Sequence, residues 1–397
     1  MDPLSQAVLG AVLPQSLLKT QRPEVQQHGS TDPATDQIAN ERQTGTGEAE
    51  GTGRGWVPLP ALSLALVGAL AGMAPDLDVF IRSSTDPLLF LEYHRQFTHS
   101  LIFIPIGAAL CALAFWPFLR RTWSFRTIWL VALLGYGTHG LLDACTTYGT
   151  LLLWPFSQER IAWNNVSVVD PLVTLPVMLA VLWSVRSASK LPARIGLAWC
   201  LCYLLFGVVQ QHRAEAAAAA LAASRGHENV SVSAKPSLGN LLLWKVVYRH
   251  EGRFWVDAVR TGIDVAVIGG DDVEILDLAK HLPWLDPASQ QALDLERFRW
   301  FSSDHLAVDK GNPNFVVDMR YSMLPNEIEG LWGIRLDPSA SLEEHVEYVV
   351  RRDARGRVQR FIAMLVESPD APPESLHRRS DAQPVPDATA RSSGRQP

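Results

Sequence analysis

The chain has 397 residues, of which 19% are charged, and a formal net charge of −6 at pH 7. This length allows two or three domains. The slightly acidic balance gives no basic signature, so we expect no nucleic-acid partner. The four cysteines lack C-x-x-C spacing and lie in or beside apolar runs, which favours buried thiols over disulfides or thiolate metal sites.

The first element in chain order is an apolar helix over residues 1–18, which include PLSQAVLGAVLPQSLL. Asp2 stands where a signal peptide carries positive charge, and no A-x-A cleavage site follows. A helix over residues 3–18 would be roughly 24 Å long, slightly less than the hydrocarbon core of a bilayer. We therefore expect a thin transmembrane helix or a re-entrant one.

Residues 19–55 and 367–397 differ in character from the rest of the chain. The segment 28–55 has no aromatic residue and is rich in Gly, Thr and charge. Such a composition cannot bury enough apolar surface to become ordered. We predict a disordered insertion at 19–55 and a disordered tail at 367–397.

A block over residues 56–212 contains the longest apolar runs. At most one residue in each run is acidic or is a histidine, and Gly or Pro within them is tolerated in membranes. The runs are 56–74, 100–118, 127–142, 166–185 and 195–211. With the first helix, they predict a mainly α-helical integral membrane protein with five to six transmembrane helices.

A small soluble α+β domain is expected to follow over residues 225–366. The segment 213–224 contains AEAAAAALAA, which should continue the last span as an exposed connecting helix. Five runs rich in β-branched and aromatic residues predict strands, and 286–301 begins like a capped helix. The strand runs are 240–248, 253–261, 314–322, 330–337 and 345–350. We recognise no catalytic motif in this domain.

Charge in the short loops predicts how the protein is oriented in the membrane. The loops 119–126 and 186–194 each carry three Lys or Arg residues, which is typical of the cytoplasmic side. The loops 75–99 and 143–165, and the C-terminal domain, then face away from the cytoplasm. We expect a multi-pass protein of a bacterial inner membrane.

Six ligand-type side chains collect on that outer face. In HGLLD, the i and i+4 spacing puts His139 and Asp143 on one helical face. PDLD and HRQFTH supply the other four: Asp76, Asp78, His94 and His99. Imidazole with carboxylate is the ligand set of catalytic zinc, or of iron and manganese. Such a cation makes a nucleophile from water near neutral pH.

Each of these residues also has a simpler interpretation. A single histidine at a helix end is more often hydrogen-bonded than ligating, and Asp76 can cap a turn. Arg95 and Arg160 can bind an anionic substrate or stabilise developing charge, but Arg160 can equally extend to lipid headgroups. The hypothesis of a metal site depends on six residues from three segments converging on one face.

At this point the sequence resembles a known family. The segments MDPLSQAVLGA, GALAGMAPDLDVFI, DPLLFLEYHRQFTHSLIFIPIG, GYGTHGLLDACTTYGTLLLWPFS and RIAWNNVSVVDPLVTLP resemble YdjM-like inner-membrane proteins. These are usually described as membrane-bound metal-dependent hydrolases. The resemblance covers about residues 1–20 and 56–210 and implies metal ligation by Asp76, Asp78, His94, His99, His139 and Asp143. The family commonly has Thr-His where this chain has Ser5-Gln6, so one imidazole ligand is replaced.

The expected function is therefore a hydrolase with one or two divalent metals, preferably Zn²⁺, with Mn²⁺ or Fe²⁺ as alternatives. Asp76 and Asp78 would be ligands or general bases, and Thr98, Thr147 and Tyr148 would donate hydrogen bonds to the substrate. The expected partners are membrane lipid and a lipid or lipid-linked ester or phosphodiester, and the oligomeric state is open. The alternatives are a metal-binding or transport protein without hydrolysis, and a structural membrane protein whose outer domain binds partners.

Overall fold

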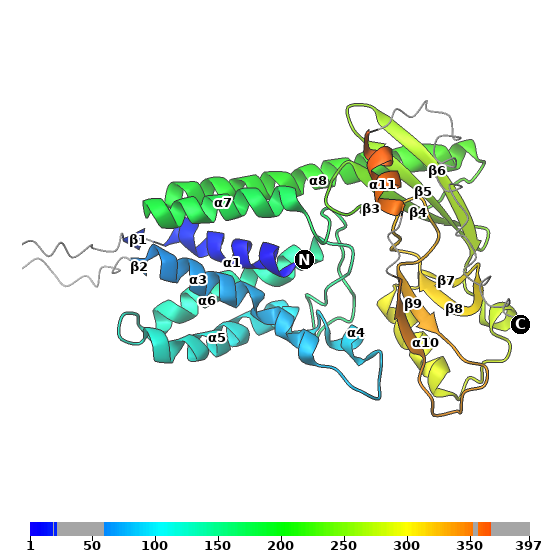
Figure 1. Cartoon of the computed structure of the whole chain (residues 1–397), viewed down its shortest axis with the longest axis horizontal. Helices are drawn as coiled ribbons and strands as arrows, with labels where there is room; N and C mark the ends of the chain where they lie inside the picture. Colours follow the sequence, from blue (N-terminus) through cyan, green and yellow to red (C-terminus); the bar gives the residue numbers. More distant parts are fainter. Residues whose placement is uncertain (19, 22–58, 352–355, 367–397) are drawn as a thin grey trace, which may run out of the picture. The chain divides into compact units, whose positions relative to one another are not determined.

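The computed structural model describes residues 1–18, 20–21, 59–351 and 356–366 (Figure 1). The chain divides into two compact units. The first unit comprises residues 1–83, 89–207 and 238–240, and the second contains the other described residues. The predicted disordered tail lies outside the described residues, as does the predicted insertion apart from residues 20–21.

The first unit is helical. Its main helices are α1 (Pro3–Leu17), α3 (Ala61–Met73), α5 (Ile104–Leu119), α6 (Phe125–Ala144), α7 (Pro171–Ser187) and α8 (Lys190–Ser224), which continues into the second unit. Shorter elements are η1 (Ala74–Phe80), α4 (Leu89–Tyr93), η2 (Phe97–His99), η3 (Leu101–Phe103) and the paired strands β1 (Thr20–Gln21) and β2 (Leu59–Pro60). The Asp2 and Asp170 side chains accept backbone hydrogen bonds at the starts of α1 and α7.

Helices α1, α3 and α6 meet in close contact at Gly68. A Cβ atom added at Gly10 or at Gly135 would lie about 2.5 Å or less from the carbonyl oxygen of Gly68. Small residues at a helix contact allow backbones to approach this closely. The contact brings the middle of α1 close to α3 and α6, and Gln6, one turn before Gly10, reaches Asp143 near the end of α6.

Three helical segments among the described residues are long and apolar enough to cross a membrane. They are Ala61–Phe80, Leu101–Leu119 and Lys190–Ser224, and Pro171–Ser187 is a shorter apolar helix. The predicted count of five to six spans is therefore not confirmed. Helix α1 has 15 residues and buries Ser5, Gln6, Gln15 and Ser16, so its polar side chains face the helical unit.

The second unit contains two four-stranded antiparallel sheets. One has the order β3 (Val232–Pro236), β4 (Leu243–His250), β5 (Arg253–Thr261), β6 (Val265–Glu274). The other has the order β10 (Glu347–Val350), β9 (Trp332–Arg335), β8 (Asn312–Asp318), β7 (Leu306–Asp309). The helices are α9 (Leu278–His281), α10 (Gln290–Phe301) and α11 (Arg357–Val366). The predicted α+β character of this region is confirmed.

The core of this unit joins the two sheets. Val247, Phe254 and Val256 of the first sheet pack with Phe315 and Val317 of the second. Strands β3, β6 and β7 were not predicted, because they are short or contain charged residues, glycine or proline among their apolar residues. The prediction that residues 214–223 form an exposed helix was wrong for one side of that helix. Ala214, Ala218 and Ala222, at i, i+4 and i+8, are buried along one face of α8.

Candidate metal centre

Three elements of the first unit bring four predicted ligand residues together. Asp76 lies on η1, His99 ends η2, and His139 and Asp143 lie one turn apart near the end of α6. His99, His139 and Asp143 are buried, whereas the Asp76 side chain is 21% exposed. The i and i+4 pair was expected from the sequence, and the short 3₁₀ turns place the other two ligands beside it.

The four candidate ligand atoms have the separations that a small cation needs. The Nε2 atoms of His99 and His139 lie 2.9 Å apart, and Asp76 Oδ1 lies 3.5 and 3.3 Å from them. Asp143 Oδ2 lies 3.3 and 3.6 Å from the same two nitrogens. Four tetrahedral ligands with bonds of about 2.0–2.1 Å would lie about 3.3 Å apart. The cluster therefore fits a tetrahedral N₂O₂ site.

Hydrogen bonds determine which ring nitrogens carry protons. His139 Nδ1 lies 2.5 Å from the carbonyl oxygen of Gly72, which can only accept, so Nδ1 donates. His99 Nδ1 lies 2.9 Å from Thr98 Oγ1, whose own proton is donated to Asp78, so this nitrogen also donates. In the neutral form of each ring, Nε2 is then the atom with the lone pair, and the two Nε2 atoms lie 2.9 Å apart. A cation between them would be ligated by both lone pairs.

Asp143 also offers a candidate ligand atom for a cation. Its Oδ2 is buried and accepts no hydrogen bond from the described residues, although Arg95 Nε forms an ion pair with it at 3.1 Å. Its Oδ1 accepts a hydrogen bond from Gln6 Nε2 at 2.9 Å and another from the α-amino group of Met1. A buried carboxylate oxygen without a hydrogen-bond donor among the described residues, next to two imidazole Nε2 atoms, suits a divalent cation.

Asp78 connects the surrounding residues. Its Oδ1 lies 2.7 Å from His94 Nδ1, and its Oδ2 accepts from Thr98 Oγ1 at 2.8 Å and from the backbone nitrogen of Arg95 at 3.0 Å. Oδ2 also lies 3.2 Å from His99 Nδ1. Asp78 thus orients a candidate ligand histidine. Asp76, Asp78 and His94 form a second group whose ligand-type atoms lie within 4.8 Å of one another.

Arg95 has an unusual backbone conformation. Its φ is 65°, which is uncommon for a residue with a side chain and costs of order 1–3 kcal/mol. Its guanidinium donates to Thr146 Oγ1 at 3.0 Å and lies over the Tyr148 ring. The hydroxyl of Thr146 in turn donates to the backbone carbonyl of Asp143. This chain of contacts holds a positive charge beside Asp143.

The remaining predicted residues lie around this cluster. Arg160 donates to the carbonyl oxygen of Gly149 at 2.9 Å and lies over the Tyr148 ring, 5.4 Å from its centroid. Thr98 donates to Asp78, and Thr147 is buried. The structure therefore places Thr98 and Arg95 within the cluster, whereas the Tyr148 ring contacts both Arg95 and Arg160. Their predicted roles toward a substrate stay predictions.

Several residues that shape the site were not predicted from the sequence. Gly72 supplies a carbonyl acceptor, Thr146 connects Arg95 to α6, and Gly140 allows the backbone of His99 to approach α6. A Cβ atom at Gly140 would fall 2.3 Å from the carbonyl oxygen of His99. The only signal in the sequence is the glycine directly after the histidine of HGLLD, and glycine is common in membrane helices away from any site.

The second unit has a separate cluster of buried charge. Lys235 on β3 lies opposite Lys245 on β4, and both side chains are buried. Burial, reinforced by neighbouring cations, lowers the pKa of Lys235 to about 8 and that of Lys245 to about 7. Lys245 Nζ donates to Ser322 Oγ at 2.9 Å and to the carbonyl oxygen of Glu327 at 2.8 Å.

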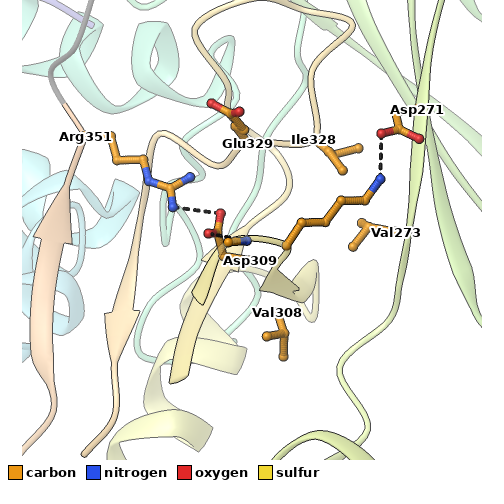
Figure 2. Close-up of a pocket in the computed structure, with 9 residues that line it drawn as sticks. Asp271, Val273, Val308, Asp309, Ile328, Glu329 and Arg351 are labelled. Atoms are coloured by element: carbon orange, nitrogen blue, oxygen red, sulfur yellow. Dashed lines mark hydrogen bonds and ion pairs between the residues drawn. The ribbon is translucent and has the colours of Figure 1, made fainter. Parts of the chain in front are cut away.

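Figure 2 shows a pocket of about 310 Å³ in the same unit. Ion pairs cross it between Lys310 and Asp271 at 2.6 Å, and between Arg351 and Asp309 at 2.7 Å. Glu329 at its rim is paired with Arg357. Because its acids and bases neutralise each other, this pocket offers no set of ligands comparable to the His/Asp cluster.

Comparison with known proteins agrees with the membrane character of the first unit. The family described as YdjM inner membrane protein matches residues 1–214, more than half of the chain. The chain belongs to this family. The family resemblance noted in the sequence is thus confirmed, and the family is named for an inner membrane protein.

Two curated relatives are similar over shorter stretches. The inner membrane protein YbcI of Escherichia coli (strain K12) is 34% identical over 113 residues, 26% of this chain and 62% of the relative. The uncharacterized protein YfhP of Bacillus subtilis (strain 168) is 28% identical over 124 residues, 31% of this chain and 37% of the relative. The chain thus matches less than two thirds of either relative's length. No solved structure matches it.

Proposed function

We propose that this protein is a membrane-bound, metal-dependent hydrolase that cleaves an ester or phosphodiester. The observation that carries the proposal is the pair of imidazole Nε2 atoms, 2.9 Å apart, that lie beside two carboxylate oxygens. A divalent cation held by these residues would supply Lewis-acid chemistry and would lower the pKa of water toward neutrality. Zn²⁺ suits this donor set best, with Mn²⁺ and Fe²⁺ as alternatives.

Solvent exposure and charge would give the residues of the site different roles. Asp76 is the only one of the four ligand residues with appreciable exposed surface, so water and substrate would approach past it. Arg95 would compensate the charge of Asp143 and hold it in place. Water would add across the scissile bond, and the products would be an acid and an alcohol.

The location of the cluster favours a lipid or lipid-linked substrate. Asp76 lies near the end of the candidate span Ala61–Phe80, and His99 stands just before the candidate span Leu101–Leu119. Ligands at the ends of two apolar helices would lie at the boundary between acyl chains and water. The Lys and Arg residues in loops 119–126 and 186–194 support an extracytoplasmic position for this boundary.

One observation favours the alternative of a metal-binding protein without hydrolysis. Three of the four candidate ligand residues are almost fully buried, and a catalytic zinc needs an open coordination position. In this alternative Asp76 completes a closed site, and the metal only stabilises the helical unit. The two functions differ in turnover, but both require bound metal.

The test is metal content followed by turnover. Wild-type protein in detergent is compared with His139→Ala/Asp143→Ala and with His212→Ala, which removes an imidazole that is 74% exposed. We expect near-stoichiometric zinc, manganese or iron in wild type and His212→Ala, and none in the double variant after its folding has been checked. The loaded proteins are then incubated with phospholipid vesicles and with a soluble phosphodiester.

The outcomes separate the alternatives. Release of a headgroup, fatty acid or phosphate by wild type and His212→Ala, but not by the double variant, supports the hydrolase. Bound metal without turnover of any ester or phosphodiester favours the closed metal site. Absence of bound metal after reconstitution would overturn both functions.

A further inference from the structure

Helix α8 contains a polar boundary near Gln210. Residues 195–211 are uncharged, and α8 is one of the three candidate membrane spans. Seventeen helical residues rise roughly 26 Å, close to the thickness of a hydrocarbon core. Val209 is still exposed, and Gln210, Gln211, His212 and Arg213 follow it. Helix α8 would therefore leave the hydrocarbon at Gln210–Arg213.

The turn between β5 and β6 is attached to α8 at this boundary. Gln210 Nε2 donates to the carbonyl oxygen of Thr261 at 2.6 Å. The guanidinium of Arg213 donates to the carbonyl oxygens of Gly262 and Ile263, at 2.8 and 3.1 Å. These hydrogen-bonding groups belong to one unit, so the turn is held at the height where α8 would leave the bilayer.

The rest of β5 runs along α8, away from that height. Arg225, twelve residues further along the chain than Arg213, pairs with Asp257 at 2.6 Å and lies over the Trp255 ring. The turn between β4 and β5, with Glu251, comes later still along the same direction. The nine residues of β5 span roughly 30 Å. One end of this sheet therefore lies at the proposed membrane boundary, and the other end lies roughly that distance from it.

The end at the boundary carries exposed apolar side chains. Ile263 is 99% exposed, although turns normally use Gly, Asn, Asp or Pro. Leu242 is also exposed, and its carbonyl oxygen accepts from the backbone nitrogen of Thr261 at 2.7 Å, so it lies beside the turn. At the other end of β5, the corresponding turn residue is the charged Glu251.

Helix α11 adds a second apolar stripe near the same end. Phe361, Met364 and Leu365 pack on the sheet, whereas Val358, Ile362 and Val366 at i, i+4 and i+8 are exposed. Arg260, next to the end of β5, donates to the carbonyl oxygen of Met364. Figure 1 shows α11 (orange) running across the direction of α8 residues 208–224, which belong to the same unit.

We propose that Ile263, Leu242 and the outer stripe of α11 form a lipid-contacting surface that seats the C-terminal unit on the bilayer. Helix α11 resembles an interfacial helix with an apolar side and a charged side. The exposed stripe forms the apolar side, and Arg357 and Arg360, which pair with Glu329 and Glu327, form the charged side. The inference depends on α8 spanning the membrane and does not depend on hydrolysis.

The test measures membrane depth residue by residue. The full chain, with its four native cysteines replaced by alanine, receives one spin label at Ile263→Cys, Ile362→Cys or Glu251→Cys. Glu251 is the matched control, because its side chain is 85% exposed in the opposite turn of the same strand. In liposomes, accessibility to oxygen and to a water-soluble nickel complex is compared at each label.

We expect labels at 263 and 362 to be at least several-fold more accessible to oxygen than to nickel, and the label at 251 to show the reverse. Nickel accessibility at 263 equal to that at 251 would overturn the proposal. Spin–spin broadening between copies at 263 or 362 would also overturn it in favour of a second copy of the chain. If the cysteine-free protein does not fold, a photoactivatable phospholipid is cross-linked to wild type. Adducts at residues 261–265, and none at 250–253, are then expected, and the opposite pattern refutes the surface.

Discussion

Replacing Asp78 by asparagine distinguishes an orienting residue from a metal ligand. Asp78 holds His99 Nδ1 at 3.2 Å and His94 Nδ1 at 2.7 Å, while its Oδ2 also accepts from Thr98 and from the backbone of Arg95. Asparagine has the same shape but only one oxygen, and it lacks the negative charge. We expect Asp78→Asn to keep the fold and to weaken metal binding without abolishing it.

The expected loss of metal-binding free energy follows from the contacts that the substitution removes. A hydrogen bond to a charged group contributes about 1.5–3 kcal/mol, against about 0.5–1.5 kcal/mol for a neutral one. If the remaining oxygen keeps its three donors, the main loss is the charge that holds the His99 tautomer, of order 1–2 kcal/mol. This corresponds to a fall in metal affinity of about 5–30-fold, which overlaps the range of about 10–100-fold that is usual for partners of ligand histidines.

The assay is a competition titration of the detergent-purified protein against a chromophoric zinc chelator. Thr98→Val is measured in parallel, because it removes one hydroxyl from the same carboxylate and should cost less. His139→Ala is the reference for a lost ligand and should bind no zinc. Complete loss of zinc in Asp78→Asn would make Asp78 a ligand, and an unchanged affinity would refute the orienting role.

Three further predictions test the centre and the C-terminal unit. Gly140→Ala should lower metal content and melting temperature, because its Cβ would fall 2.3 Å from a backbone oxygen of η2, whereas Gly137→Ala, with 3.6 Å to its nearest neighbour, should change little. Gln6→Ala removes a donor to Asp143 and should lower unfolding stability by about 1–3 kcal/mol in thermal denaturation, and an unchanged melting temperature would contradict the hydrogen bond. The pKa of Lys245 falls from 10.5 to about 7 on folding, so the unfolded chain binds more protons between these values and stability should rise with pH there, by at most about 1.4 kcal/mol per unit. Lys245→Met should reduce this slope when denaturation is followed by tryptophan fluorescence at pH 7 and 9.5.

The sequence by itself determined the membrane character of the chain and the composition of its cluster. Uncharged runs are a local property, so they identify α3, α5 and α8 without knowledge of their neighbours. The i and i+4 spacing of His139 and Asp143 is also local, since helix geometry alone puts them on one face. The strands β4, β5 and β8 were predicted near their true positions because β-branched and aromatic residues are concentrated there.

Only the tertiary structure decided which candidate ligands meet and which residues support them. His94 and His99 are alike in sequence, yet His99 turns its Nε2 toward His139, whereas His94 turns its Nδ1 toward Asp78. That difference comes from the left-handed backbone at Arg95 and from the turn that follows it. The contributions of Gly72 and Gly140 likewise depend on how closely helices approach, and no local pattern encodes such distances. Composition therefore predicts the donor types, but the packing of separate segments sets the geometry of the site.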